Sequence, residues 1–398
     1  MKLERIEVKN YRSLFHDYDA KESFVLDLAD GMNAVTGPNN VGKSNVLRAL
    51  SLALDPDFEF DRVVDMPALW NWSKPSVTLT FRVPQRGRAA REATLLKLVN
   101  EYERKLNPSV KRTYAEDGEI RLRVTIEGSE DSAGTRRQVF VAKGVGARSL
   151  TDDDPVAKKA LDSFHRCIHF VLIESGQSLE SLMEGRFRDI LHNVLREDLR
   201  SEVEAAGKVR QAYSNDLQTG LLKRLSDRIR EEVGEMFQEI SDVELVPQVP
   251  SLEETLAKMR VRVSDLAITD LSDKGTGVRG GLIVAMLRHF AEVGKRSMVF
   301  AVEEPESFLH PAAQEGLRED LEALAKRPDI SLLVTTHSPH IVSRQPNARV
   351  FGLDKDSEGR TIVREQADGD APQASVLGGL YRDRLVMEYL DRCEDLAG

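Results

Sequence analysis

Cysteine is scarce in this sequence, and long apolar runs are missing from it. Only Cys167 and Cys393 occur, which excludes a disulfide scaffold and a cysteine-based zinc site and fits a reducing compartment. No apolar run approaches the roughly 20 residues that a membrane span requires, and the polar–apolar alternation of the first residues is unlike a signal peptide. We therefore expect a cytoplasmic protein with no membrane partner.

An excess of positive charge is also missing. The formal net charge is −10, with 56 basic and 66 acidic residues. A protein of this charge would contact nucleic acid only through a local basic patch or through a partner. The composition, with 41% hydrophobic and 31% charged residues, is typical of a globular protein, and 398 residues suffice for two domains or for one large domain with an insertion.

Hydrophobic patterning predicts an α/β protein in which strands and helices alternate. Short apolar or alternating runs predict strands at 3–9, 24–28, 32–36, 76–83, 120–127, 137–143, 167–173, 297–302 and 330–336. Helical spacing predicts helices that start near Lys43 and cover 88–106, 184–241, 282–293 and 312–326. The long helical stretch is expected to form an arm that folds back on itself and ends before Pro247.

The strongest functional signal is a phosphate-loop pattern, Gly37-Pro38-Asn39-Asn40-Val41-Gly42-Lys43-Ser44, between an apolar strand and an amphipathic helix. Successive backbone N–H groups of such a loop converge on phosphates, and the helix N-terminus adds partial positive charge. Lys43 is expected to neutralise the β- and γ-phosphates, and the Ser44 hydroxyl to ligate Mg²⁺. The expected nucleotide-binding residues of this segment are Gly37, Asn39, Asn40, Val41, Gly42, Lys43, Ser44 and Asn45.

Two further apolar strands end in polar residues. The strand at 297–302 runs into Glu303 and Glu304, and the strand at 330–336 runs into His337. Because the carboxyl ends of parallel strands meet at one edge of a sheet, both groups should lie beside the phosphate loop. There the first acid would hold Mg²⁺ through water, the second would orient the attacking water, and the histidine would hydrogen-bond the γ-phosphate.

These three motifs, in this order, resemble the ABC-type ATPases of the RecF, SMC and OLD group. The opening VKNYRSL, the string EEPESFLHP that begins at Glu303, and the Thr336-His337-Ser338-Pro339 string are similar to segments of that group, the last two to its OLD branch. The resemblance implies that the chain binds ATP and Mg²⁺ in a head-to-head homodimer, with Glu304 as catalytic base and His337 as γ-phosphate sensor. Glu303 stands where many relatives carry Asp.

The segment from Leu271 to Arg279 precedes an apolar helix, where the same group keeps its signature motif. The resemblance implies that this loop caps the γ-phosphate of the opposite subunit, through backbone N–H groups and a lysine. The residues expected to contact the nucleotide are Ser272, Lys274, Gly275, Thr276 and Gly277. An ordinary Ser/Gly turn that leads into a helix is the alternative.

Two single residues carry weaker signals. Gln177 follows the strand at 167–173, roughly where a glutamine would couple Mg²⁺ to the helical arm, although an exposed polar turn explains it equally well. Arg12 lies in the opening string and would approach the nucleotide as in relatives, with a surface arginine as the alternative.

OLD nucleases continue into a Toprim domain, whose metals are held by a Glu and an Asp-x-Asp pair. After residue 352 this sequence has 46 residues, which we expect to be too few for such a domain, and Asp354 and Asp356 are interpreted as a hairpin turn. The chain is therefore expected not to be a nuclease itself. Basic residues at Arg86–Arg91, Lys97–Lys105 and Lys111–Arg112 form a candidate patch for duplex DNA, with a solvated helix face as the default interpretation.

The sequence thus predicts an ABC-type P-loop ATPase head, a mixed or parallel sheet with flanking helices, and an inserted helical arm. The expected domains are a lobe with the phosphate loop and a β-rich part (1–183), the arm (184–250), a second lobe (251–352) and a short extension (353–398). The expected function is an ATP-hydrolysing dimeric switch in DNA repair or anti-phage defence. The alternative is a nucleotide-gated scaffold for a separately encoded Toprim-type nuclease.

Overall fold

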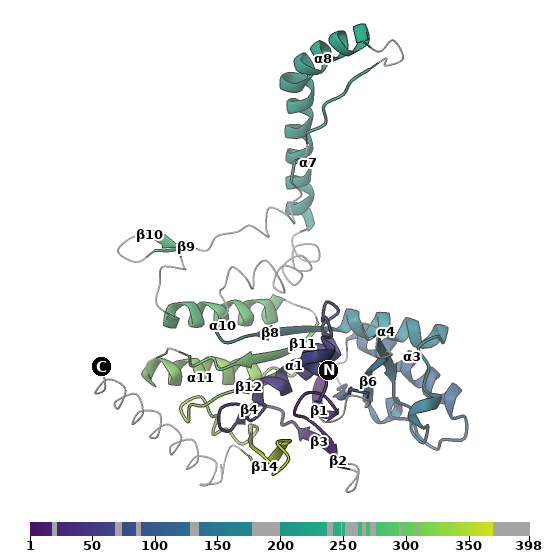
Figure 1. Ribbon diagram of the computed structural model, residues 1–398, viewed down its shortest axis with the longest axis vertical. Coiled ribbons are helices and arrows are strands. Elements are labelled where there is room, and N and C mark those ends of the chain that lie inside the picture. The colour runs from purple at the N-terminus through teal and green to yellow at the C-terminus, as the bar shows by residue number, and fades with distance from the viewer. Residues whose placement is uncertain are drawn as a thin grey trace. The chain divides into compact units, whose positions relative to one another are not determined.

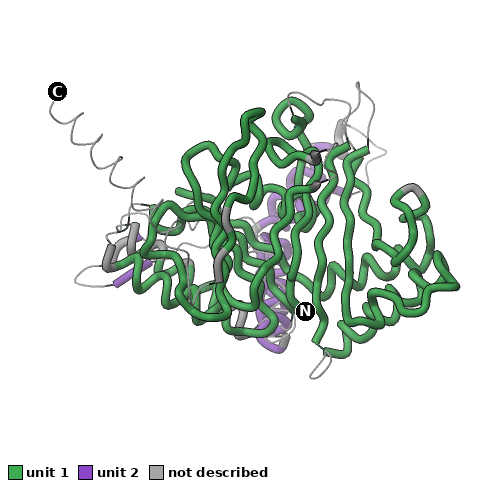
Figure 2. The backbone as a smooth tube through the Cα atoms, turned by 90° about the horizontal axis from the view of Figure 1, so that it is seen from below, with its two compact units in different colours: residues 1–177, 275–291, 295–398 green, residues 178–274, 292–294 purple. Residues whose placement is uncertain are grey.

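The computed structural model describes residues 1–17, 22–67, 74–84, 89–127, 135–176, 200–236, 242–247, 249–250, 262–264, 268–270, 276–293, 296–307, 309 and 311–368. The chain forms two compact units (Figure 2). Unit 1 comprises residues 1–177, 275–291 and 295–398, and unit 2 comprises residues 178–274 and 292–294. Unit 2 is thus inserted, in sequence, between two parts of unit 1. The domain boundaries expected from the sequence stay a prediction.

The first sheet of unit 1 is mostly parallel, with strand order β14-β13-β4-β12-β11-β8 (Figure 1). Neighbours from β13 to β8 pair in parallel, and only β14 is antiparallel. The strands are β4 (Met32–Thr36), β8 (Ile168–Ile173), β11 (Ser297–Glu303), β12 (Ile330–Thr335), β13 (Arg349–Lys355) and β14 (Thr361–Asp368). Every residue of β4 and β12 is buried, because a parallel sheet is covered on both faces, which explains why these strands are mainly apolar and do not alternate with polar residues.

The second sheet of unit 1 is antiparallel, with strand order β2-β3-β1-β5-β6-β7. Burial alternates residue by residue along β6, as expected for a sheet with one face on the core. The strands are β1 (Lys2–Lys9), β2 (His16–Asp17), β3 (Glu22–Asp27), β5 (Ser76–Arg82), β6 (Glu119–Glu127) and β7 (Thr135–Phe140).

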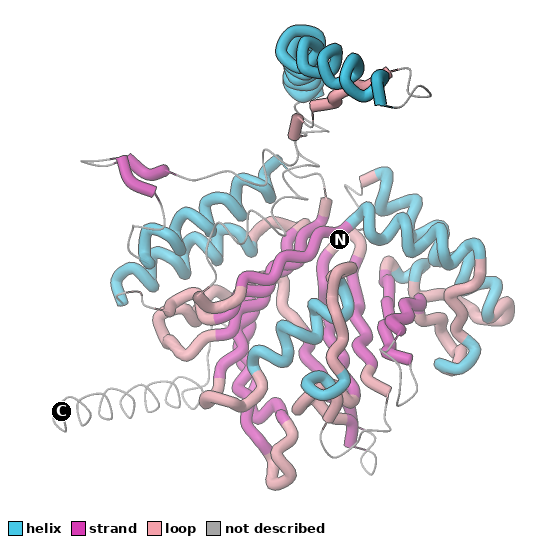
Figure 3. The backbone as a smooth tube through the Cα atoms, turned by 45° about the horizontal axis from the view of Figure 1, so that its top comes forward, coloured by secondary structure: helices cyan, strands magenta, loops and turns pink. Residues whose placement is uncertain are grey.

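Helix α1 (Lys43–Leu54) packs between the two sheets (Figure 3). It contacts β5 and β6 of the antiparallel sheet and β8, β11 and β12 of the parallel sheet. Helix α11 (Pro311–Ala325) contacts β4 and β12, on the other side of the parallel sheet. The sandwiched position of α1 explains why its apolar residues surround the helix: Val46, Leu47, Leu50 and Leu52 are each at most 1% exposed.

Helix α4 (Pro155–Cys167) was not expected from the sequence. Its start carries a signal that patterning alone overlooked, because the Asp154 side chain accepts a hydrogen bond from Val156 N at 2.8 Å and proline occupies the first helical position. Cys167 therefore ends a helix, whereas the sequence placed it at the start of a strand. The helix packs on α3 (Ala90–Leu106).

The described part of the arm in unit 2 corrects the expected fold-back between two helical legs. Residues 200–236 form one helical run, α7 (Arg200–Asp216), a π-helical segment η3 (Leu217–Leu222) and α8 (Lys223–Met236). Residues 200–216 contain no proline and one glycine, so no residue there stops the helix. The chain returns in extended form, with Leu245 N donating to Ser226 Oγ at 3.2 Å. Residues 184–199 lie outside the described residues.

The remaining elements are short apart from α10. They are α2 (Arg62–Asp65), η1 (Ala115–Asp117), η2 (Ala147–Ser149), β9 (Arg262–Ser264), β10 (Ile268–Asp270) and α10 (Thr276–Val293). Among the helices that the structure describes, none is long and apolar enough to cross a membrane. The expected fold class, an α/β head with a mixed sheet and flanking helices, is confirmed.

Candidate nucleotide-binding site

The carboxyl ends of four parallel strands bring the predicted motifs to one edge of the sheet. The phosphate loop follows β4, Glu304 follows β11, the His337 segment follows β12, and Ser175 follows β8. The register aligns these ends, because Val35 pairs with Thr335 and Thr335 pairs with Glu303. This edge is where open α/β sheets bind their ligands.

Glycine is required at both ends of the phosphate loop. Gly37 and Gly42 have φ angles of 142° and 108°, in the region that favours glycine. A Cβ atom at Gly37 would lie 2.6 Å from the Leu353 carbonyl oxygen, and one at Gly42 would lie 2.7 Å from Ser13 Oγ. The loop can therefore lie this close to β13 and to the β1–β2 turn only with glycine at both positions.

The Lys43 side chain is buried within the loop that precedes it, with 5% of the residue exposed. Its Nζ atom donates to the carbonyl oxygens of Gly37 at 3.1 Å and Pro38 at 3.0 Å. An ammonium group held against loop carbonyls in this way is placed to exchange those bonds for stronger ones to a phosphate oxygen.

Residues distant in the sequence form hydrogen bonds with the phosphate loop and its helix. Thr361, at the start of β14, is 4% exposed and donates from Oγ1 to the Val41 carbonyl at 2.7 Å, across 320 positions. Ser13 Oγ lies 2.6 Å from Thr361 Oγ1 and accepts from Asn45 Nδ2 at 2.8 Å. No role was assigned to either residue from the sequence: Ser13 lies within the opening VKNYRSL string, and no local pattern marks Thr361.

Replacing Thr361 with valine is expected to loosen the phosphate loop. The change removes the hydroxyl and leaves the Val41 carbonyl without this donor, so the free energy of unfolding should fall by about 1–3 kcal/mol, and ATP binding should weaken. Chemical denaturation and calorimetric titration with ATP measure the two effects. Thr361→Ser keeps the hydroxyl and should behave like the wild type. Wild-type ATP affinity in Thr361→Val would contradict the supporting role.

Arg12 lies beside the loop helix and is not a freely solvated surface residue. Its side chain is 18% exposed, and its NH2 group pairs with Asp65 at 2.6 Å. Its NH1 group donates to Asn45 Oδ1 at 3.4 Å. The backbone of Arg12 has a φ of 50°, an uncommon conformation for a residue with a side chain, and its N–H is bonded to the Asp65 carbonyl at 3.0 Å.

Glu303 and Glu304 leave the end of β11 in different directions. Glu303 Oε2 accepts a hydrogen bond from Ser175 N at 3.5 Å, which brings the segment after β8 next to it. Glu304 has a φ of 42°, and its N–H donates to the Thr335 carbonyl at 2.9 Å. Strained backbone of this kind often occurs at functional sites.

The two predicted catalytic side chains lie together. His337 Nε2 is 3.1 Å from Glu304 Oε1, close enough for an ion pair when the imidazole is protonated. Both side chains are about one third exposed, at 30% and 34%, so they border solvent at the sheet edge.

Glu306 is a residue of this site to which the sequence assigned no role. Its Oε1 atom accepts hydrogen bonds from Thr336 Oγ1 at 2.5 Å, His337 N at 2.7 Å and Ser338 N at 3.2 Å. Burial raises the pKa of this carboxyl above its ordinary value, the hydrogen bonds from Thr336 and His337 act in the opposite direction, and the negative charge of Glu304 adds to the rise. The EEPE string contained this residue but did not show which groups it would face.

Some of the other predicted positions lie within the described residues and some lie outside them. Gln177 and residues 271–275, with Ser272, Lys274 and Gly275, lie outside the described residues. Thr276 and Gly277 begin α10. Asp354 and Asp356 lie in a β-hairpin, where they pair with Arg364 at 2.9 Å and Arg360 at 2.6 Å; the hairpin is as predicted, with Asp356 in its turn and Asp354 still in strand β13. Among the described residues, no group of three His, Cys, Asp or Glu side chains is placed to hold a metal ion.

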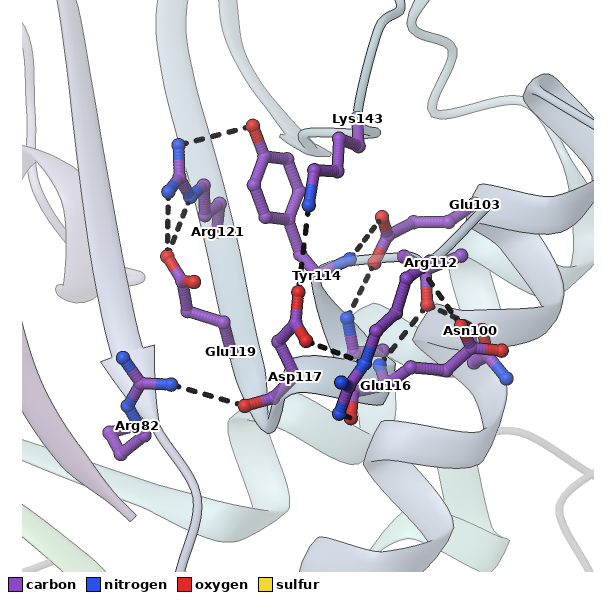
Figure 4. A network of polar contacts seen from close by, with 12 residues as sticks. Arg82, Asn100, Glu103, Arg112, Tyr114, Glu116, Asp117, Glu119, Arg121 and Lys143 are labelled. Atoms are coloured by element: carbon purple, nitrogen blue, oxygen red, sulfur yellow. Dashed lines mark hydrogen bonds and ion pairs between the residues drawn. The ribbon is translucent and has the colours of Figure 1, made fainter. Parts of the chain in front are cut away.

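Three of the six described basic residues of the candidate DNA patch, Arg104, Lys105 and Arg112, pair with acidic neighbours (Figure 4). Arg112 pairs with Asp117 at 2.7 Å, and Lys143 reaches the same carboxylate at 3.5 Å. Arg104 pairs with Glu116 at 2.6 Å, and Lys105 pairs with Asp154. Residues 86–88 lie outside the described residues. These pairs favour the default interpretation, a solvated helix face, over a DNA-binding patch.

Comparison with known proteins agrees with the geometry of the sheet edge. A sequence profile described as the AAA ATPase domain (AAA_15) matches residues 1–142 and 174–342. The Old nuclease of Escherichia phage P2 is 23% identical over 83% of this chain, and the OLD nuclease of Thermus scotoductus is 22% identical over 91%. The chain spans 57% and 63% of the length of these two relatives. The solved structure of an SMC head bound to the C-terminal winged-helix domain of ScpA aligns over 93% of this chain and 99% of its own, with a TM-score of 0.49 and 12% identity.

Proposed function

This chain belongs to the AAA ATPase domain family, and from that premise we propose that it binds ATP with Mg²⁺ at the edge of its parallel sheet and hydrolyses it. The single observation that carries the proposal is that a phosphate loop, a paired-carboxylate strand end and a histidine meet at this edge. The resemblance to the OLD and SMC group that the motifs predicted is confirmed by the family match and by the two OLD relatives.

Each residue has a distinct role in the proposed reaction. The loop N–H groups and Lys43 hold the β- and γ-phosphates and neutralise their charge. The Ser44 hydroxyl and the Glu303 carboxylate are hard oxygen donors of the kind that Mg²⁺ prefers, and the ion would neutralise charge that develops on the phosphates. Glu304 orients and polarises the attacking water, and His337, next to it, hydrogen-bonds the γ-phosphate. Arg12, whose charge is paired with Asp65, hydrogen-bonds Asn45 in the first turn of the loop helix.

We propose further that two copies close around ATP. The segment at 271–279 would cap the γ-phosphate of the opposite copy, as the resemblance implies, and hydrolysis would reopen the dimer. Because Lys43 and Glu304 belong to one copy and the capping loop to the other, neither copy would have a complete site alone.

The dimer proposal is tested by the mass of the protein with and without ATP. Glu304→Gln, which should retain ATP, is expected to double its mass when ATP and Mg²⁺ are added, as measured by sedimentation velocity. Lys43→Ala should stay at the mass of the nucleotide-free protein, and Gly277→Asp should bind ATP without dimerising. If the mass of Glu304→Gln did not depend on ATP, the proposal of a nucleotide-gated dimer would be refuted.

A second candidate function is a nucleotide-gated scaffold that holds and releases a nuclease in DNA repair or anti-phage defence. The observation that favours it is that both relatives are called nucleases, whereas Asp354 and Asp356 of this chain are paired with Arg364 and Arg360. An assay of plasmid DNA cleavage, with the purified chain alone and with a Toprim-type nuclease added, separates the candidates. ATP-dependent cleavage only in the mixture supports the scaffold.

A further inference from the structure

Glu306 lies in the turn after β11, two residues beyond Glu304. The turn is closed by hydrogen bonds from Ser307 N to the Glu304 carbonyl at 3.0 Å and from Leu309 N to the Glu306 carbonyl at 2.8 Å. This backbone fixes the direction of the Glu306 side chain, which reaches the loop after the neighbouring strand β12.

Three donors of that loop converge on a single oxygen atom. Thr336 Oγ1, His337 N and Ser338 N all donate to Glu306 Oε1, at distances of 2.5, 2.7 and 3.2 Å. Consecutive N–H groups that point at one carboxylate oxygen form a small anion-binding cradle. The carboxylate therefore determines the path of the chain through His337.

The second oxygen of Glu306 makes no comparable contact. Oε2 is shielded from solvent and accepts no hydrogen bond from the described residues. A half-satisfied buried carboxyl is unfavourable for stability, and a neutral side chain would bridge the same loop at less cost. Natural proteins leave a buried polar group without a partner mainly at functional sites.

The geometry that Glu306 maintains is the pairing of His337 with Glu304. Two hydrogen bonds connect the turn after β11 with the end of β12 and the loop that follows it. Glu304 N donates to the Thr335 carbonyl at 2.9 Å, and His337 N donates to Glu306. With both hydrogen bonds in place, His337 Nε2 lies 3.1 Å from Glu304 Oε1. Without the hydrogen bond from His337 N to Glu306, the loop after Thr335 would be less firmly held against the turn that carries Glu304.

We propose that Glu306 is a positioning residue for ATP hydrolysis, and that its carboxylate clamps the Thr336–Ser338 segment so that His337 and Glu304 face the γ-phosphate together. The proposal rests on the proposed function, since it assigns Glu306 to the same reaction. Among the described residues, the hydrogen bonds of the Glu306 carboxylate go to Thr336–Ser338 and not to the phosphate loop or to Glu303, so its effect should be on the hydrolytic step.

Two substitutions at Glu306 separate this role from general stability. Glu306→Ala removes the acceptor, and ATP turnover is expected to fall at least tenfold while the Kd for ATP stays within threefold of the wild type. Glu306→Gln keeps a carbonyl oxygen for the same donors and should recover most of the turnover. Val342→Ala is the matched control, because Val342 is 1% exposed shortly after the same loop and packs on Ala34 and Val350 away from the clamp. Its loss of stability should leave turnover intact.

A double-mutant cycle shows whether Glu306 acts through His337. In the background of His337→Ala, the change Glu306→Ala should have little further effect on turnover. The proposal would be overturned if the fold-losses of turnover from the two single changes multiplied in the double variant. It would also be overturned by wild-type turnover in Glu306→Ala.

Amide hydrogen exchange supplies a readout that needs no ATP hydrolysis. The amide of His337, which donates to Glu306 at 2.7 Å, should exchange at least tenfold faster in Glu306→Ala and at the wild-type rate in Glu306→Gln. Wild-type protein that binds ATP without turnover would refute the proposed function, and the exchange rates would still decide whether Glu306 holds the loop. Unchanged exchange in Glu306→Ala would refute the clamp while leaving the ATPase proposal in place.

Discussion

Replacing Lys43 with alanine is expected to abolish ATP binding, with a loss of affinity of at least about 100-fold, roughly 3 kcal/mol. The Lys43 ammonium is buried inside the loop, 3.0–3.1 Å from two of its carbonyl oxygens, where a phosphate would be shielded from water. Charge-assisted bonds to phosphate are strong in such a place, and alanine supplies neither charge nor donor. Titration with a fluorescent ATP analogue measures the loss.

Lys97→Ala is the matched control for this experiment. Lys97 is an exposed lysine on α3, so its removal changes the net charge by the same amount without touching the loop. It should bind ATP like the wild type. Circular dichroism of Lys43→Ala is needed alongside, because the change also takes a buried side chain from between the loop and α1. ATP binding by a folded Lys43→Ala protein at near wild-type affinity would refute the assignment of the phosphate loop.

Replacing Glu304 with glutamine should leave ATP binding nearly intact and lower ATP turnover by at least about 100-fold. The substitution conserves shape, but an amide cannot accept the proton of the attacking water or polarise it as a carboxylate does. Binding is retained because the phosphates are held by the loop and not by this side chain. Release of inorganic phosphate under saturating ATP measures turnover, and the same titration as above measures affinity.

The chain supplies a second Glu–His pair as a control. Glu315 Oε1 lies 3.4 Å from His340 Nδ1, on α11 and the loop after β12, outside the predicted nucleotide site. Glu315→Gln should leave turnover unchanged, because no hydrogen bond or ion pair of the described residues joins this pair to the phosphate loop or the paired acids. Equal turnover by Glu304→Gln and the wild type would show that Glu304 is not the catalytic base.

Short stretches of sequence predicted much of the fold. Strands β4, β11 and β12 were found within a residue or two, because each is a short and mainly apolar run. Patterning was wrong where helix signals came from a single cap, as at Asp154 before α4. It was also wrong in the described part of the arm, where apolar residues on separate stretches suggested two legs and residues 200–236 form one helical run.

The candidate site shows the same division. The phosphate loop could be identified from eight consecutive residues, because its function depends on local backbone shape: Gly37 and Gly42 adopt positive φ angles that other residues avoid. The carboxylates and the histidine could be placed beside it, because parallel strands end at a common edge.

The sequence by itself therefore determined the chemistry of this protein: a phosphate-binding loop, two acids and a histidine on buried strands. Only the tertiary structure decided what holds those groups in place. Thr361 reaches Val41 because β13 pairs with β4 and carries β14 with it, and Glu306 reaches His337 because β11 and β12 are neighbours in register. Such contacts depend on strand order and register, which arise from packing of the whole sheet and leave no mark within a short window of residues.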